Sequence, residues 1–248
     1  MEGWGQCWQV DPDPASENHS SPTRTVLGGS GGAFESVAVD NTDPNEPIFF
    51  LTEDHEAGAL RRFVADGNGW DSLHNGGTTS YLYFIDDQNF EWTSSIDDGR
   101  RSAQWYYPNS EGISYFDGML YFVSKEMQTL YTLDLAQMTY QREGTGGSHL
   151  LGRGSFNAQP DQIFIASGVG EAGKRYQYFT EDGGSSPGLF ARDGDGSYYT
   201  VFQGIEGVYE DDETVGIAFT RDRTRLYAGL QDAGVLLELT RDDGMPFE

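Results

Sequence analysis

Short apolar runs separated by acidic or glycine-containing turns recur along the chain, and this pattern predicts β-hairpins. The paired arms are residues 48–51 with 59–64, 119–123 with 130–133, 188–191 with 198–202, and 226–230 with 235–239. Two further runs, 81–85 and 163–166, have the composition of single strands. The pattern therefore predicts an all-β protein.

Several hairpins are preceded by a strand that begins with a glutamate, namely Glu35, Glu111 or Glu213. Units of about 40–50 residues with three or four antiparallel strands are typical of propeller blades. We therefore predict a single β-propeller domain over residues 1–248, with about five to six blades and an incomplete first blade. A β-sandwich is the competing fold, because it explains the strands but not the repeated glutamate.

Two stretches break this regular spacing, and we expect long polar loops there: residues 67–108 and 144–159. Helical periodicity is almost absent from the chain. The longest helix-compatible stretch, residues 133–142, is short and has no good cap.

The charge of the chain limits its partners. Its 40 acidic and 15 basic residues give a net charge of −25, which repels phosphate backbones and anionic headgroups, so we expect no nucleic-acid or membrane partner. Such a surface suits either cation binding or simple solvation.

The beginning of the chain lacks the features of a signal peptide, and no apolar run is long enough to span a membrane. Cys7 is the only cysteine, which excludes an internal disulfide and a cysteine-based zinc site, and we expect it to be a buried strand residue.

Carboxylates at the head of the repeated units are the main candidate for chemistry. In a propeller the first strand of each blade lines a central channel, so Glu35, Glu111 and Glu213 should converge there. Crowded carboxylates repel one another, and a hard cation with oxygen ligands, Ca²⁺ above all, relieves the repulsion. The alternative is that these glutamates cap turns or face solvent.

A second acidic set follows two predicted strands, where the triplet Thr-Glu-Asp occurs at 52–54 and again at 180–182. Asp161 begins the strand that precedes the second triplet. The full set of candidate metal ligands is Glu35, Glu53, Asp54, Glu111, Asp161, Glu181, Asp182 and Glu213.

Seven short motifs occur in an order that resembles the PhoX-type alkaline phosphatase family of large β-propellers. They are Val10-Asp11-Pro12, residues 32–36, Thr52-Glu53-Asp54 with residues 60–63, residues 108–112, Pro160-Asp161-Gln162, Glu181-Asp182-Gly183, and residues 213–222. The resemblance extends over nearly the whole chain. It implies hydrolysis of a small phosphate monoester at calcium ions with iron, in a periplasmic or secreted protein. The ligands that it implies are Glu35, Glu53, Glu111, Asp161, Glu181 and Glu213.

The chain departs from the family pattern at the positions that matter for catalysis. The family's iron-binding cysteine lies in a segment upstream of the first motif, so we do not expect iron. The arginine expected to hold phosphate corresponds to Asn109, the candidate substrate-binding residue, and a motif histidine corresponds to Phe34. Two functions stay open, with no catalytic residue assigned. One is a PhoX-like calcium-dependent phosphomonoesterase, and the other is a non-catalytic calcium-binding propeller that acts as a structural or protein-interaction module.

Overall fold

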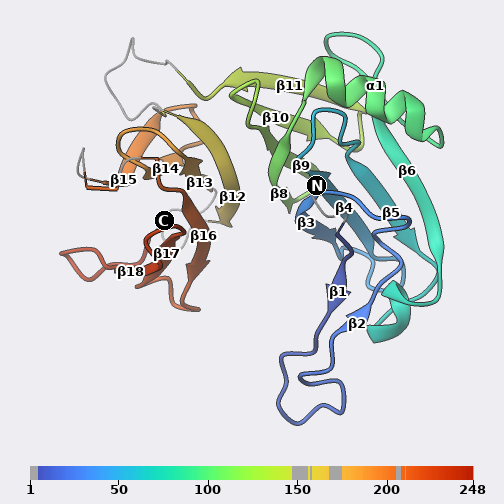
Figure 1. Ribbon diagram of the computed structural model, residues 1–248, viewed down its shortest axis with the longest axis horizontal. Helices are drawn as coiled ribbons and strands as arrows, with labels where there is room; N and C mark the ends of the chain where they lie inside the picture. The colour runs from blue at the N-terminus through green and yellow to red at the C-terminus, as the bar shows by residue number, and fades with distance from the viewer. Residues whose placement is uncertain are drawn as a thin grey trace. The chain divides into compact units, whose positions relative to one another are not determined.

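Antiparallel meanders, in which strands pair in the order of the sequence, make up the computed structural model (Figure 1). The structure describes residues 5–146, 156, 158–167, 175–204, 208–209 and 211–247. The chain divides into two compact units, residues 1–110 and 111–248, whose positions relative to one another are not determined. The expected single domain over the whole chain stays a prediction.

The first unit contains a five-stranded sheet in the order β3-β4-β5-β6-β7 and a two-stranded pair, β1-β2. The strands are β1 (Trp8–Gln9), β2 (Thr23–Arg24), β3 (Phe34–Asp40), β4 (Ile48–Glu53), β5 (Arg61–Ala65), β6 (Gly77–Phe84) and β7 (Phe90–Thr93). Alternate side chains of β4 and β5, among them Leu51 and Phe63, form the core, and Cys7 packs against it. The expectation that Cys7 is a buried strand residue is wrong, because Cys7 is half-buried and precedes β1. Its partial burial still raises the pKa of the thiol.

The expected long loop over residues 67–108 is wrong, because this stretch contains β6, β7, a 3₁₀ turn (Trp70–Leu73) and helix α1 (Ile96–Tyr106). The hydroxyl of Ser95 caps α1 by accepting a hydrogen bond from the Asp98 amide, and acidic residues occupy the first turn. The helix packs on β6, where the Tyr107 hydroxyl donates to the Leu82 carbonyl at 2.9 Å. The Ser95 cap can be recognised in the sequence, but the helix buries only small residues and lacks the large apolar residues that usually mark a buried face.

The second unit contains three sheets, ordered β11-β10-β9-β8, β12-β13-β14-β15 and β16-β17-β18. Their strands are β8 (Ser110–Phe116), β9 (Met119–Ser124), β10 (Thr129–Asp134), β11 (Thr139–Gly144), β12 (Gln159–Ser167), β13 (Arg175–Asp182), β14 (Gly188–Arg192), β15 (Tyr198–Gln203), β16 (Thr214–Phe219), β17 (Leu226–Leu230) and β18 (Val235–Leu239). The helix-compatible stretch 133–142 is a hairpin, in which Leu133 pairs with Tyr140. Most of the expected 144–159 loop lies outside the described residues.

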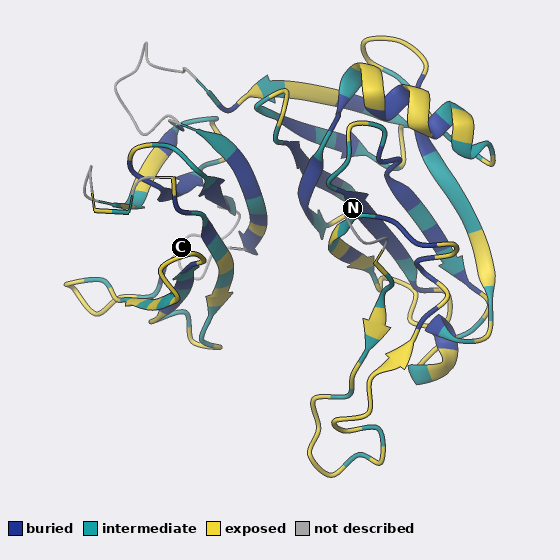
Figure 2. Cartoon of the chain, viewed as in Figure 1, coloured by how far each residue is buried: buried dark blue, intermediate teal, exposed yellow. Residues whose placement is uncertain are grey.

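Two apolar clusters connect the three sheets of the second unit. One joins Val123 of β9 to Ile163 of β12 and Phe179 of β13, and the other joins Tyr178 of β13 to Leu226 of β17. Buried residues concentrate in the central strands of the sheets, and exposed residues lie on hairpin tips and outer edges (Figure 2). Removing such side chains from water stabilises the fold by about 1.5–3 kcal/mol each.

The all-β prediction and every predicted hairpin are confirmed, for example by the pairing of Ile48 with Val64 and of Leu130 with Val123. In the described parts of the chain every sheet is open. Within those same parts, no helix has the length and hydropathy needed to cross a bilayer.

Candidate metal centre

A shared bulge places a carboxylate at the start of two of the sheets. In β3 the pairing with β4 shifts between Phe34 and Val37, and in β12 the pairing with β13 shifts between Pro160 and Ile163. In each bulge two residues face a single residue of the partner strand: Glu35-Ser36 face Thr52, and Asp161-Gln162 face Thr180. Bulges of this kind redirect side chains and are common beside functional sites.

A threonine on the partner strand holds each bulge in the same way. Thr52 Oγ1 accepts a hydrogen bond from the Ser36 amide at 3.1 Å, and Thr180 Oγ1 accepts one from the Gln162 amide at 2.8 Å. Glu35 and Asp161 therefore occupy equivalent positions, each beside a Thr-Glu-Asp triplet. Each Thr-Glu-Asp triplet and the carboxylate in the bulge beside it therefore form a structural motif that occurs in both sheets.

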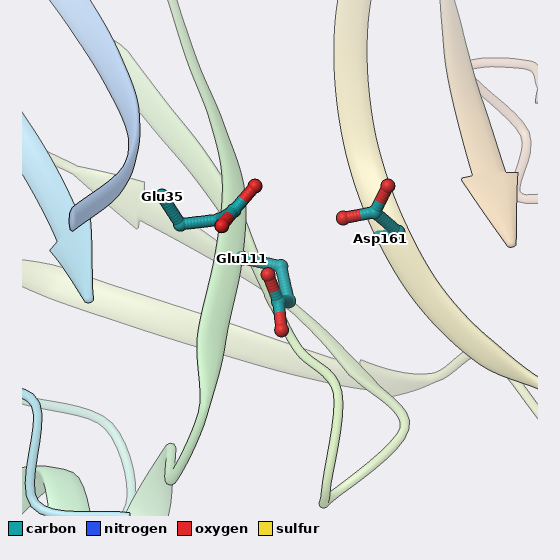
Figure 3. A group of neighbouring side chains, drawn as sticks. All are labelled: Glu35, Glu111 and Asp161. Carbon is teal, nitrogen blue, oxygen red and sulfur yellow. The ribbon is translucent and has the colours of Figure 1, made fainter. Parts of the chain in front are cut away.

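Glu111 on β8 and Asp161 on β12 lie together in the second unit (Figure 3). One carboxylate oxygen of each lies within 4.8 Å of the other, and each residue is only 2% exposed. Thr180 Oγ1 and the Gln162 side-chain amide donate to Asp161, each at 3.1 Å. Two buried carboxylates at this separation favour a bound cation. Figure 3 also labels Glu35, which is exposed on β3 of the first unit.

Gly112 allows the backbones of β8 and β12 to approach at this centre. A Cβ atom at this position would lie 2.4 Å from the Ile163 nitrogen and 2.7 Å from the Asp161 carbonyl oxygen. Because both are backbone atoms, no side-chain rotation can make room. The glycine after Glu111 is therefore needed to keep the two carboxylates close.

We expect Gly112→Ala to separate the strands, to destabilise the protein by about 1–3 kcal/mol, and to weaken any cation binding at Glu111 and Asp161. Chemical denaturation with and without calcium measures both effects. Gly194→Ala is the matched control, because a Cβ at Gly194 meets nothing within 4 Å. Equal stability and equal calcium response of the two variants would show that the close approach has no role.

Lys125 belongs to the same centre and was not among the sequence candidates. Its ammonium lies 3.1 Å from Glu111 Oε1 and 3.0 Å from Asp182 Oδ2. The signal that could have identified it is the triplet Ser124-Lys125-Glu126, which lies where β9 ends, as the Thr-Glu-Asp triplets lie where β4 and β13 end.

Glu181 lies near the end of β13, and Glu213 lies just before β16. Glu181 is fully buried, and its Oε1 accepts a hydrogen bond from the Ala158 amide at 2.5 Å. Glu213 forms an isolated backbone bridge with Asp182, and its Oε2 accepts from the Gln231 side chain at 2.9 Å.

Glu213 was expected to be equivalent to Glu35, but the strand pairing places it one residue earlier. The Gln231 amide donates to the Glu213 carbonyl, so Glu213 faces Gln231 as Phe34 faces Glu53. Asp161 corresponds to Glu35, because each lies in the bulge at the start of its strand. The bulge of β16 falls later, between Val215 and Ala218, so Glu213 does not lie in it. A bulge shifts register without changing composition, so the sequence pattern did not distinguish the two positions.

Glu53 and Arg61 form a buried ion pair in the first unit. Arg61 Nη2 and Nε lie 2.8 and 2.9 Å from Glu53 Oε1, and both residues are 5% exposed. Arg61 Nη1 also donates to the Gly28 carbonyl at 2.9 Å, and the guanidinium lies over the Phe34 ring. Glu53 is therefore neutralised by the chain itself.

Asn109 and Asp54 are also partners. The Asn109 side-chain amide donates to Asp54 Oδ1 at 2.7 Å, and the Asn109 backbone amide donates to the His55 carbonyl at 3.1 Å. Asn109 has a positive φ of 50°, which asparagine tolerates better than most residues. The contacts give Asn109 a role in fixing the turn after β4.

Comparisons with known proteins give similarity in structure alone. No family model matches the chain, and no curated protein matches it. Pseudomonas fluorescens PhoX in complex with vanadate, a transition state analogue, is similar with a TM-score of 0.67 and 16% identity, over 93% of this chain and 57% of that chain. A chain of the nidogen–laminin complex is similar with a TM-score of 0.55 and 12% identity, over 96% of this chain and 76% of that chain. The chain thus spans little more than half the PhoX chain, and at these identities the likeness shows a propeller-like all-β fold.

Proposed function

We propose that this protein binds a divalent cation, with Glu111 and Asp161 as its first ligands. The observation that carries the proposal is the close approach of these two buried carboxylates. Calcium is the proposed ion, because it takes several oxygen ligands in flexible geometry and tolerates mixed carboxylate and carbonyl donors. Iron is left out of the proposal, since the lone cysteine packs against an apolar core.

The other candidate ligands differ in how well their surroundings suit the role. Glu35 stays a proposed ligand of the first unit, because its bulge is equivalent to that of Asp161. Glu181, Asp182 and Glu213 lie on strand ends of the second unit, as expected of further ligands. Glu53 and Asp54 are weaker candidates, since Arg61 and Asn109 already engage them.

We propose that each meander is one blade of a propeller. Strands paired in sequence order, with the first strand at one edge, are what a blade requires. The likeness to PhoX supports this arrangement. About five to six blades, with an incomplete first blade, is the number that the sequence predicts.

Hydrolysis of a small phosphate monoester is the second candidate function, and the likeness to a PhoX structure that holds a transition state analogue favours it. Fixed cations would neutralise the charge that develops on the transferring oxygens. A small ester also suits a chain whose net charge of −25 disfavours nucleic acids and anionic membranes. The replacement of the expected arginine by Asn109, which is bonded to Asp54, favours instead a non-catalytic calcium-binding module.

Assay of p-nitrophenyl phosphate hydrolysis separates these functions. A calcium-binding enzyme will release p-nitrophenol in calcium and not in EDTA, and Asp161→Asn will abolish the turnover. A calcium-binding module will bind the ion without turnover. Equal rates in calcium and in EDTA would contradict metal-assisted hydrolysis.

A further inference from the structure

We infer that the ammonium of Lys125 is part of the metal centre and competes with the divalent ion for Glu111 and Asp182. Lys125 thereby lowers the affinity and the number of calcium ions that bind. The inference rests on the proposed function. It concerns a residue that neither the sequence candidates nor the likeness to other proteins indicates.

The internal repeat shows that Lys125 stands where the neighbouring sheets have a glutamate. Each repeat has a hydroxyl residue near the end of its second strand, followed by a charged residue: Thr52-Glu53 in β4, Thr180-Glu181 in β13, and Ser124-Lys125 where β9 ends. The first strands align in the same way, as Glu35-Ser36-Val37, Asp161-Gln162-Ile163 and Glu111-Gly112-Ile113. The sheet that begins with Glu111 has therefore exchanged an anionic position for a cationic one.

The residue type at this position is unusual for the chain. Lys125 and Lys174 are its only lysines, whereas the remaining basic residues are all arginines. An ammonium group is a compact point charge on a flexible stem, and it resembles a metal ion more closely than a planar guanidinium does. A lysine suits a position where a cation can be present or displaced.

The contacts of Lys125 are those of a counter-ion. Its ammonium lies 3.1 Å from Glu111 and 3.0 Å from Asp182. It therefore links the start of β8 to the end of β13. The Glu111 side chain is 2% exposed and that of Lys125 is 24% exposed, so the carboxylate is buried while the ammonium can swing toward solvent. A calcium ion that binds Glu111 must share that carboxylate with Lys125 or displace it.

Two opposite effects follow from this competition. Without calcium, Lys125 relieves the repulsion among the carboxylates and stabilises the fold. With calcium, its positive charge opposes the ion and weakens binding. A lysine that served only to support the strands would stabilise both forms and would not change calcium affinity.

Calcium titration calorimetry, combined with thermal unfolding in EDTA and in calcium, tests the inference on the wild-type protein, Lys125→Met and Lys125→Glu. Lys125→Met removes the charge and keeps the apolar stem, so we expect calcium affinity to rise about tenfold and the melting temperature in EDTA to fall. Lys125→Glu restores the glutamate of the neighbouring repeats, and we expect it to bind more calcium per chain than the wild type. Arg221→Glu is the control, because it makes the same change of charge at an exposed turn residue of the second unit.

Each pattern of results decides between the two proposals. Wild-type affinity and stoichiometry in both Lys125 variants would overturn the inference and leave the proposed function standing. Calcium binding by the Lys125 variants but not by the wild type would support the inference and contradict the proposed function. Absence of binding in all the proteins would overturn both.

Discussion

Asp161→Asn will abolish the calcium-induced stabilisation of this protein. The wild type in calcium at a hundredfold excess over its Kd should gain about 2.7 kcal/mol, which corresponds to a rise of roughly 5–10 °C in melting temperature for a chain of this size. The substitution keeps the shape of the side chain and removes one of the two buried charges at the centre. We expect the melting temperature in EDTA to stay close to that of the wild type, because the lost charge also removes repulsion from Glu111.

Thermal unfolding with and without calcium measures this effect, and Glu126→Gln is the matched control. Glu126 is an exposed carboxylate next to Lys125, so its removal changes the net charge by the same amount without touching the centre. We expect Glu126→Gln to keep the full calcium response. If Asp161→Asn kept it as well, Asp161 would not be a ligand.

Arg61→Met will destabilise the first unit by about 3–5 kcal/mol, because it leaves the buried Glu53 carboxylate without its partner. The loss also removes the hydrogen bond from Arg61 to the Gly28 carbonyl. Chemical denaturation measures the free energy of unfolding. The same chain with Glu53→Gln added should recover part of the loss, since no buried charge then stays unpaired.

Arg101→Met provides the comparison for this ion pair. Arg101 pairs with Asp98 on the surface of α1, and its side chain is 69% exposed. A pair of this kind contributes about 0–1 kcal/mol, so Arg101→Met should hardly change the free energy of unfolding. Equal effects of Arg61→Met and Arg101→Met would contradict the role of the buried pair in the core.

The sequence predicted strands and hairpins well because their signal is local. Alternating apolar residues around a glycine or acidic turn specify a hairpin within a few residues, as at Leu226–Leu230 and Val235–Leu239. Helix α1 was missed for the opposite reason. It buries only small residues such as Gly99 and Ala103, so it lacks the large apolar residues by which a buried helix face is usually recognised.

The candidate site could be predicted only in part. The repeated glutamates made Glu111 a candidate, and Asp161 was one because it begins the strand before the second Thr-Glu-Asp triplet. The position of Glu213 depends on a bulge, which composition does not reveal. The pairing of Glu53 with Arg61 joins residues eight positions apart across a turn, and the role of Lys125 depends on contacts between separate sheets. Such contacts require the pairing register of the strands.

Calcium titration of the purified, EDTA-stripped wild-type protein by isothermal calorimetry tests the central claim most directly. We expect saturable binding with a Kd below about 1 mM, and its loss in Glu111→Gln combined with Asp161→Asn. The absence of saturable heat from the wild type, or an unchanged isotherm for the double variant, would contradict the account.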